Sequence, residues 1–164
     1  MFAAHAIDTS DKPRFYHELA AQMEGLLIGE ADAIANAANV SALLFQSMPD
    51  LNWAGFYFLR SPDELVVGPF QGKPACVRIA VGRGVCGSAV AERRSIIVED
   101  VTKADNHIFC DPDSRSELVV PLVRDGKIIG VIDLDSPTPG RFDEDDRAGV
   151  ERLAEIYVAA SASF

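Results

Sequence analysis

Cys110 lies in a polar loop, and Glu117 follows it seven positions later, where an apolar run begins. The stretch 99–116 shows no helical or strand periodicity and is dense in Asp, Asn, Pro and Ser. Long loops without secondary structure are uncommon in compact domains and are often functional. Because a cysteine thiolate attacks electrophilic sulfur or oxygen, Cys110 is a candidate nucleophile. The alternative is an acidic surface loop without chemistry.

Two further cysteines could cooperate with Cys110. Cys86 stands among small residues where a short helix is expected, and Cys76 stands where a loop passes into an expected strand. Either could instead be a small core residue. A sulfenic acid on Cys110 would condense to a disulfide with a thiol whose Cα comes within about 6 Å. The sequence does not rank Cys76 against Cys86 for that role.

The cysteines and histidines form no metal motif. There is no CxxC pair, and the three histidines stand at positions 5, 17 and 107. Zinc sites use closely spaced cysteine and histidine ligands, so no metal site is expected. The odd number of cysteines also argues against a structural disulfide framework.

Carboxylates occupy alternate positions of a strand near the C-terminus. Asp133 and Asp135 alternate with Ile132 and Leu134, so both aspartates face one side of the sheet. Glu117 begins the expected neighbouring strand, and the three acids could surround one pocket. Repulsion between them would raise at least one pKa, which suits proton donation or the binding of an ammonium group. The alternative is an exposed strand end, with Asp135 capping a turn.

Aromatic residues gather in the first expected strand. Trp53 and Tyr57, with Phe70 beyond the following turn, could wall a small apolar pocket. Aromatic residues in such a strand also serve as core residues, and both interpretations stay open.

The elements that position these residues follow from periodicity and turn signals. One helix opens at 12–14 and a second spans about 30–48. Strands are expected at 52–59, 65–70, 75–79, 95–98, 117–123 and 128–135, with a short helix after Gly82 and an Asp-Gly hairpin turn at 125–126. A last helix spans 143–157. The pattern predicts a single α+β domain over 1–164, with about six mostly antiparallel strands and a flexible tail at 1–12.

Composition restricts the functional class. The chain has 164 residues and a net charge of −10, which disfavours nucleic acid and anionic membranes as partners. No apolar run approaches the ~20 residues of a membrane span. The N-terminus lacks the features of a secretory signal, so we expect a cytoplasmic protein with reduced thiols.

Several segments together resemble the free methionine-(R)-sulfoxide reductases, which are single GAF domains. The segments are 52–57, 68–79, 82–87, 110–117, 132–136 and 140–142, and the resemblance extends over about 14–158. The three cysteines in their local surroundings make it more specific than a general GAF pattern. It implies a GAF-like fold and the reduction of free L-methionine (R)-sulfoxide, with no bound cofactor and thioredoxin as electron donor.

The resemblance also implies roles for individual residues. Cys110 corresponds to the nucleophile, Cys76 to the resolving cysteine, and Cys86 to a third cysteine with a supporting or alternative resolving role. Glu117 and Asp135 correspond to acids near the sulfoxide oxygen. Two further positions bind substrate: Asp133 beside the amino group and Trp53 beside the methyl end.

Two other functions remain possible from the sequence. One is a non-catalytic GAF domain that binds a small ligand, and the other is a thiol redox sensor that switches between Cys110 and Cys76. The resemblance suggests a homodimer, for which the Ala-rich helix at 30–47 offers a surface.

Overall fold

The computed structural model describes residues 2–103 and 111–162, and one antiparallel sheet forms its centre. The strand order is β3-β2-β1-β6-β5-β4. The strands are β1 (Trp53–Ser61), β2 (Glu64–Gly72), β3 (Arg78–Ala80), β4 (Ile96–Val98), β5 (Ser116–Arg124) and β6 (Lys127–Ser136). The helices are α1 (Lys12–Leu27), α2 (Ala33–Ser47), α3 (Gly84–Glu92) and α4 (Glu144–Ala160), with a short 3-10 helix η1 (Val101–Lys103). The predicted α+β fold with a six-stranded sheet is confirmed.

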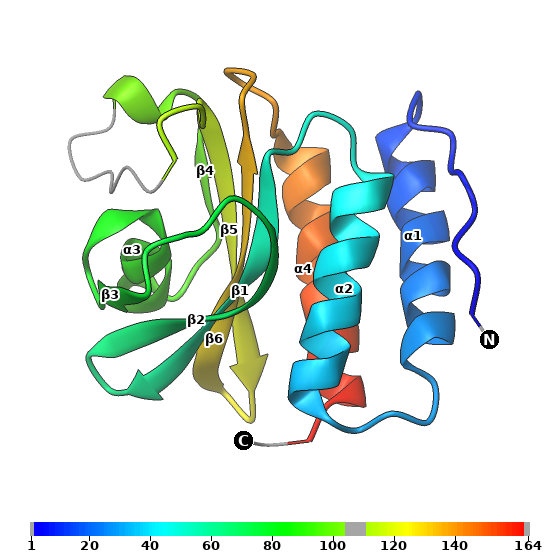
Figure 1. The fold of residues 1–164 in the computed structure, drawn as a ribbon, viewed down its shortest axis with the longest axis horizontal. Coiled ribbons are helices and arrows are strands. Elements are labelled where there is room, and N and C mark those ends of the chain that lie inside the picture. Colours follow the sequence, from blue (N-terminus) through cyan, green and yellow to red (C-terminus); the bar gives the residue numbers. More distant parts are fainter. Residues whose placement is uncertain (1, 104–110, 163–164) are drawn as a thin grey trace.

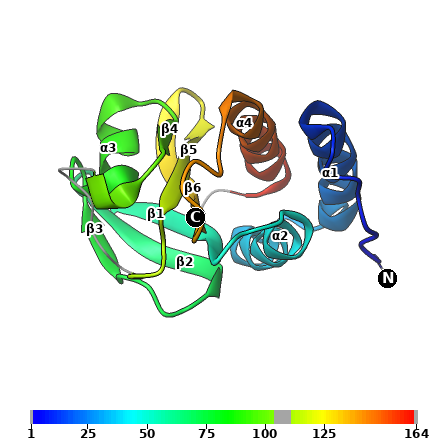
Figure 2. The same cartoon turned by 90° about the horizontal axis from the view of Figure 1, so that it is seen from above.

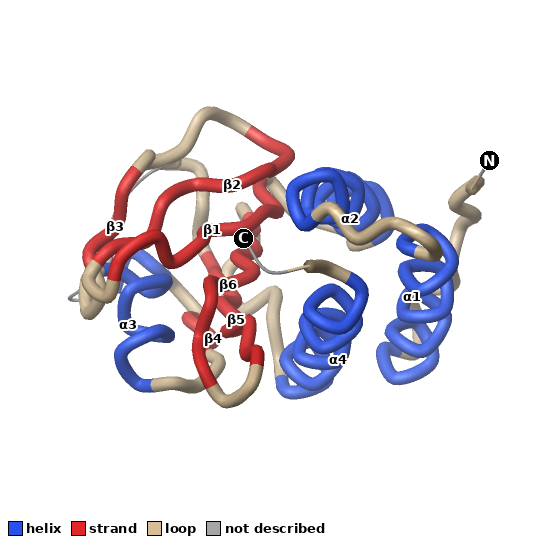
Figure 3. Tube along the Cα trace, turned by 90° about the horizontal axis from the view of Figure 1, so that it is seen from below, coloured by secondary structure: helices blue, strands red, loops and turns tan. Residues whose placement is uncertain are grey.

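Helices lie on both faces of this sheet. α2 and α4 pack directly against one face, and α1 packs on those two helices from outside (Figures 1 and 2). α3 lies on the other face beside β3 and β4, as the view from below also shows (Figure 3). Among the described residues, no helix combines the length and apolar composition that a membrane crossing requires.

Side chains along the central strands alternate between the two faces of the sheet and thereby form two separate hydrophobic clusters. Phe56 and Phe58 of β1 belong to the cluster under α1, α2 and α4, whereas Trp53 and Tyr57 belong to the cluster under α3. The same alternation divides β6, because Ile132 and its alternate neighbours face the long helices. Successive side chains of a strand point to opposite faces, so β1, β5 and β6 each contribute to both clusters.

The long helices begin at aspartates. Side-chain oxygens of Asp11, Asp32 and Asp143 accept backbone N–H groups in the first turns of α1, α2 and α4, as N-cap residues do. Asp146 completes a capping box with Asp143 and also accepts a hydrogen bond of 2.8 Å from the Tyr16 hydroxyl. The start of α4 is thereby joined to α1.

The connection between β5 and β6 is the predicted two-residue turn. Asp125 and Gly126 have φ angles of 50° and 73°, as a type I′ hairpin turn requires. This prediction is confirmed. The tight turn sets the register of the two strands that carry the acidic residues.

The third strand was predicted at 75–79 and is shorter in the structure. β3 pairs with β2 only through residues 78–80, and Cys76 lies in the loop before it rather than in a strand. The Trp53 indole N–H donates to the Lys73 carbonyl (3.2 Å), and the Tyr57 hydroxyl donates to the Cys76 carbonyl (3.1 Å). The loop therefore follows side chains of β1 instead of continuing the strand pairing.

Candidate active site

The register of the central strands brings three carboxylates to one face of the sheet. Glu117 of β5 lies opposite Asp135 of β6, and Asp133 lies between Val119 of β5 and Gly55 of β1. Because alternate residues share a face, all three acids lie on the α3 side of the sheet. The structure thus places these three candidate residues together.

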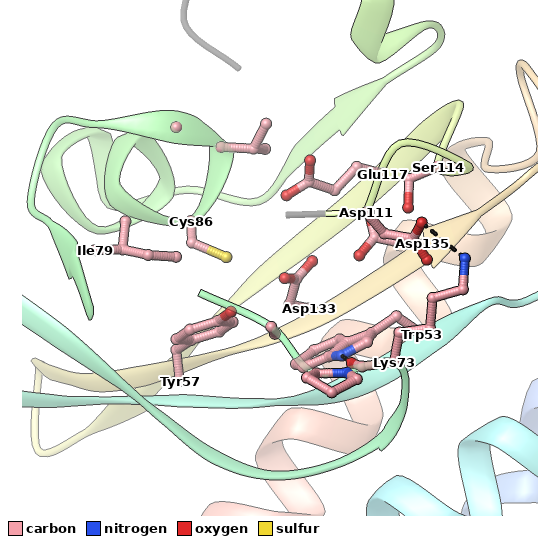
Figure 4. A pocket seen from close by; sticks show the side chains of 14 residues that line it. Trp53, Tyr57, Lys73, Ile79, Cys86, Asp111, Ser114, Glu117, Asp133 and Asp135 are labelled. Carbon is pink, nitrogen blue, oxygen red and sulfur yellow. Dashed lines mark hydrogen bonds and ion pairs between the residues drawn. The ribbon is translucent and has the colours of Figure 1, made fainter. Parts of the chain in front are cut away.

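A cavity of about 40 Å³ lies between this face of the sheet, α3 and two loops (Figure 4). Its lining consists of Trp53, Tyr57, Lys73, Pro74, Ala75, Ile79, Gly84, Val85, Cys86, Asp111, Ser114, Glu117, Asp133 and Asp135. The cavity is thus walled by both polar and apolar side chains.

The cavity acids lie in an environment that opposes ionisation. The exposed fractions of Glu117 and Asp133 are 5% and 6%. Burial raises the pKa of each, and the second cause is the charge of a neighbour, Asp135 for Glu117 and Glu117 for Asp133. Burial and the Asp133 charge likewise raise the pKa of Asp135. A raised pKa extends to higher pH the range in which the carboxyl group carries a proton that it can donate.

Cys86 reaches the same cavity from the first turn of α3. It is a free, buried thiol, and its pKa is raised by burial and then by the charge of Asp133. α3 approaches the sheet closely at Gly87, where an added Cβ would lie 2.3 Å from the Ala80 carbonyl oxygen. The first N–H groups of a helix have no acceptor within it, so this end of the cavity favours an anionic group.

An aromatic wall closes the opposite side of the cavity. The rings of Trp53 and Tyr57 lie 5.8 Å apart between centroids, and Phe70 stacks on Trp53 at 5.1 Å. Phe70 supports Trp53 from behind and does not line the cavity. Gly55 permits this packing, because a Cβ there would lie 2.3 Å from the Phe70 Cβ.

Residues that the sequence interpretation missed join two loops over the cavity. Lys73 forms ion pairs with Asp111, at 3.1 Å, and with Asp113. The Asn52 amide donates to Asp111 at 3.3 Å and to the Ser114 hydroxyl at 3.0 Å. A backbone N–H from Asp113 is the main cause that lowers the pKa of Asp111, and Lys73 contributes further. All five residues stand in the segments that carry the family resemblance, which is the signal that could have identified them.

The candidate nucleophile lies outside the described residues. Cys110 falls in the stretch 104–110, whereas Asp111, its neighbour in sequence, lines the cavity. Cys76 follows Pro74 and Ala75, which both line the cavity. Of the seven candidate residues, the structure thus brings Trp53, Cys86, Glu117, Asp133 and Asp135 into one cavity and places Cys76 at its border.

This arrangement can bind a small zwitterion. The acids provide a place for a cation, the start of α3 a place for an anion, and the aromatic wall a place for an apolar side chain. A buried carboxyl group with a raised pKa adds a proton donor, and a cysteine adds a nucleophile or reductant.

Comparison with known proteins agrees with the architecture. The GAF domain family model matches residues 35–160. The free methionine-R-sulfoxide reductase of Escherichia coli is 52% identical over 143 residues, which cover 87% of this chain and 86% of that protein.

Solved structures extend the comparison. The free methionine-R-sulfoxide reductase of Neisseria meningitidis, determined in complex with its substrate, superposes with a TM-score of 0.93 at 44% identity and covers 98% of this chain and 95% of its own. The GAF domain of a phosphoenolpyruvate-protein phosphotransferase from Coxiella burnetii has a TM-score of 0.83 at 16% identity and covers 92% of this chain and 94% of its own. The similarity to the Coxiella burnetii domain concerns the fold alone.

Proposed function

This chain belongs to the GAF-domain family of free methionine-(R)-sulfoxide reductases, and we propose that its cavity binds and reduces free L-methionine (R)-sulfoxide. As a member of this family it is an oxidoreductase. The observation that carries the proposal is that the buried carboxylates of Glu117 and Asp133 and the half-buried carboxylate of Asp135 meet the aromatic wall and α3 in one cavity.

The proposed binding mode follows from the polarity of the cavity. Asp133 and its neighbouring acids hold the substrate ammonium group, because buried carboxylates require a positive or hydrogen-bonding partner. The first turn of α3 receives the substrate carboxylate. Trp53 packs against the methyl end of the side chain. A peptide-bound methionine has neither charged group, so the cavity selects the free amino acid.

The first chemical step transfers oxygen to sulfur of the protein. The Cys110 thiolate attacks the sulfoxide sulfur while Glu117 or Asp135 donates a proton to the sulfoxide oxygen. The sulfur–oxygen bond of the substrate breaks as its hydroxyl is transferred to the Cys110 sulfur, and the transient bond between the two sulfur atoms breaks as methionine leaves. Cys110 is then a sulfenic acid. Protonation is required because an unprotonated sulfoxide oxygen is a poor leaving group, and the raised pKa values support this role for the acids.

The second step forms a disulfide. The Cys76 thiol attacks the sulfenic sulfur of Cys110, and water leaves. Two electrons and two protons from thioredoxin then restore both thiols. Cys86 has a supporting or alternative resolving role, for which its place in the cavity is suitable.

The cellular setting forms part of the same proposal. A thioredoxin-dependent enzyme that removes oxidised methionine acts under oxidative stress in the cytoplasm, where thiols are regenerated. We also propose a homodimer. Ile28 before α2 and Ile34 within it leave 84% and 44% of their surfaces exposed, and an apolar contact between two copies would cover them.

The decisive experiment is a coupled assay with thioredoxin, thioredoxin reductase and NADPH. NADPH consumption is expected with the free (R) epimer, and little or none with the (S) epimer or with a peptide containing methionine sulfoxide. Absence of turnover with the (R) epimer would refute the proposal. It would leave a ligand-binding GAF domain or a thiol redox sensor as the remaining functions.

Cysteine variants separate the two steps. Without reductant, Cys110→Ser should yield no methionine, while Cys76→Ser should yield about one equivalent per chain, because oxygen transfer precedes resolution. Activity in Cys110→Ser would show that the nucleophile is misassigned. A single turnover in Cys86→Ser but none in Cys76→Ser would place Cys76 in the oxygen-transfer step and contradict its assignment as the resolving cysteine.

A further inference from the structure

One thiol and two carboxylates in the cavity converge on a common point. The Cys86 sulfur and one oxygen each of Glu117 and Asp133 all lie within 4.8 Å of one another, and all three residues are buried. They come from α3, β5 and β6, so the fold alone brings them together. Figure 4 shows the three side chains pointing toward one another inside the cavity.

A separate observation concerns the Asp133 carboxylate at this point. Asp133 is only 6% exposed, and its Oδ1 atom has no hydrogen-bond partner among the described residues. A buried carboxylate oxygen in that situation costs free energy unless a cation or donor meets it. Lys73, the cation that lines the cavity, is engaged by Asp111 and Asp113 instead.

We propose that Cys86, Glu117 and Asp133 form a binding site for a zinc ion in the reduced protein. One thiolate and two carboxylate oxygens are a donor set that zinc accepts, with a fourth position left for water or another side chain. Calcium and magnesium require six or more oxygen ligands or several retained waters. The sulfur therefore selects a thiophilic cation.

The distances require only a small adjustment. Zinc binds sulfur at about 2.3 Å and carboxylate oxygen at about 2.0–2.2 Å. Ligand atoms around one ion then lie roughly 3.3–3.7 Å apart, so the three side chains need to close by at most about 1.5 Å from a separation of at most 4.8 Å. The expectation of no metal site rested on cysteine and histidine spacing, and the fold adds carboxylates that this spacing does not include.

Zinc in this position would exclude the substrate. It occupies the carboxylates proposed to hold the ammonium group, and it ties up the Cys86 thiol. Metal binding itself does not rest on the proposed reaction. Only the competition between zinc and methionine sulfoxide depends on that function.

The test titrates the reduced full-length protein with zinc against a chromogenic chelator, and with cadmium as a spectroscopic probe. One equivalent of zinc should bind, and cadmium should produce a sulfur-to-metal charge-transfer band. Cys86→Ser should remove the band and weaken zinc binding by about tenfold or more, and Asp133→Asn should weaken it similarly. Circular dichroism establishes that each variant is folded.

Cys76→Ser is the matched control, since it removes a thiol at the border of the cavity. Binding and the cadmium band should persist in it. Absence of zinc binding to the reduced wild-type protein would overturn the proposal. Binding that survives Cys86→Ser but disappears in Cys76→Ser would overturn it as well, because the ion would then use another thiol.

A kinetic arm tests the overlap with the substrate. Zinc should raise the apparent KM for methionine sulfoxide, and a chelator should reverse the effect. If zinc binds through Cys86 while the kinetics stay unchanged, the metal site is retained and its overlap with the substrate is refuted. If the wild-type protein lacks reductase activity but binds zinc through Cys86, the proposed function fails and the zinc site stands.

Discussion

At the scale of single residues, the cavity acids make chemistry possible at a cost in stability. Burial raises the pKa of Glu117, Asp133 and Asp135. Between the ordinary and the raised pKa values, the folded state therefore retains protons that the unfolded chain has released. Stability contributed by such groups is fully present below the ordinary carboxyl pKa of about 4. It is lost as the pH rises through the raised values.

Asp133→Asn should stabilise the protein while it abolishes activity. The asparagine cannot ionise, so the free energy of unfolding should fall less steeply with rising pH and should exceed that of the wild type by about 1 kcal/mol under mildly alkaline conditions. Urea unfolding at a series of pH values measures both effects. If the free energy of unfolding of Asp133→Asn changed with pH as steeply as that of the wild type, the raised pKa of Asp133 would be contradicted.

Asp111 supplies a control of opposite sign. Its pKa is lowered by the Asp113 backbone N–H and by Lys73, so its contribution is present above the unfolded pKa and is lost as the pH falls. Asp111→Asn should therefore lower the free energy of unfolding at neutral pH and have little effect in acid.

Glu117→Gln tests proton donation directly. The amide keeps the size of the side chain but cannot donate the proton, so kcat should fall by about 10²- to 10⁴-fold. In the wild type, kcat/KM should decline at alkaline pH as the raised-pKa acids ionise. Stopped-flow measurement of methionine release gives the rate. A fall of kcat by less than about tenfold would assign the role to Asp135.

At the scale of elements, Lys73 links the loop before β3 with the loop before β5. The first of these loops contains Cys76, and the second leads into the strand that carries Glu117. Lys73→Gln should change stability by at most about 1 kcal/mol, because the side chain is exposed. It should slow multiple turnover more than the single turnover of methionine, since resolution requires both loops to meet. Lys73→Arg keeps the charge and should retain most activity; equal slowing in both variants would contradict an ionic role.

Gly55→Ala should disturb the aromatic wall. The added Cβ would lie 2.3 Å from the Phe70 Cβ and 2.7 Å from a Trp53 ring carbon, so overpacking should cost about 1–3 kcal/mol. Trp53 is the single tryptophan of the chain, and its fluorescence should shift. The control is Gly25→Ala in α1, where the nearest atom is 3.6 Å away. It should be neutral or stabilising by up to about 1 kcal/mol. An unchanged melting temperature in Gly55→Ala would contradict the close packing.

Local signals predicted most of the elements. The Asp-Gly turn at 125–126, the alternation around Asp133 and the helical stripes each depend on neighbours in sequence, and the structure contains the corresponding elements. The strand expected at 75–79 was wrong in extent. Its loop is held by side chains of β1, a long-range contact that no local pattern reveals.

The cavity shows the same division between local and long-range information. Alternation placed Asp133 and Asp135 on one face, and the pairing of β5 with β6 added Glu117. The approach of α3 and the ion pairs of Lys73 depend on how distant segments pack. The thiol and two carboxylates of the inferred zinc site therefore had no counterpart in the sequence spacing.

At the scale of the whole molecule, the sheet separates packing under the long helices from packing around the cavity. Leu153 of α4 is fully buried in the first of these clusters. Leu153→Ala should lower the free energy of unfolding by about 3 kcal/mol. Because the site lies across the sheet, kcat/KM per folded molecule should stay within about twofold of the wild-type value. Thermal unfolding and active-site titration together check this, and a large change in KM would show that the faces are coupled.

The separation of the two faces has an evolutionary consequence. Each central strand alternates between a residue that holds the helices and a residue that faces the cavity. Substitutions of cavity-facing residues can accumulate without disturbing the packing of the helix-facing residues. One lineage can therefore exchange its ligand while it inherits the scaffold. Transplanting the cavity residues alone onto a related scaffold is therefore a more promising route to new redox enzymes than rebuilding the whole domain.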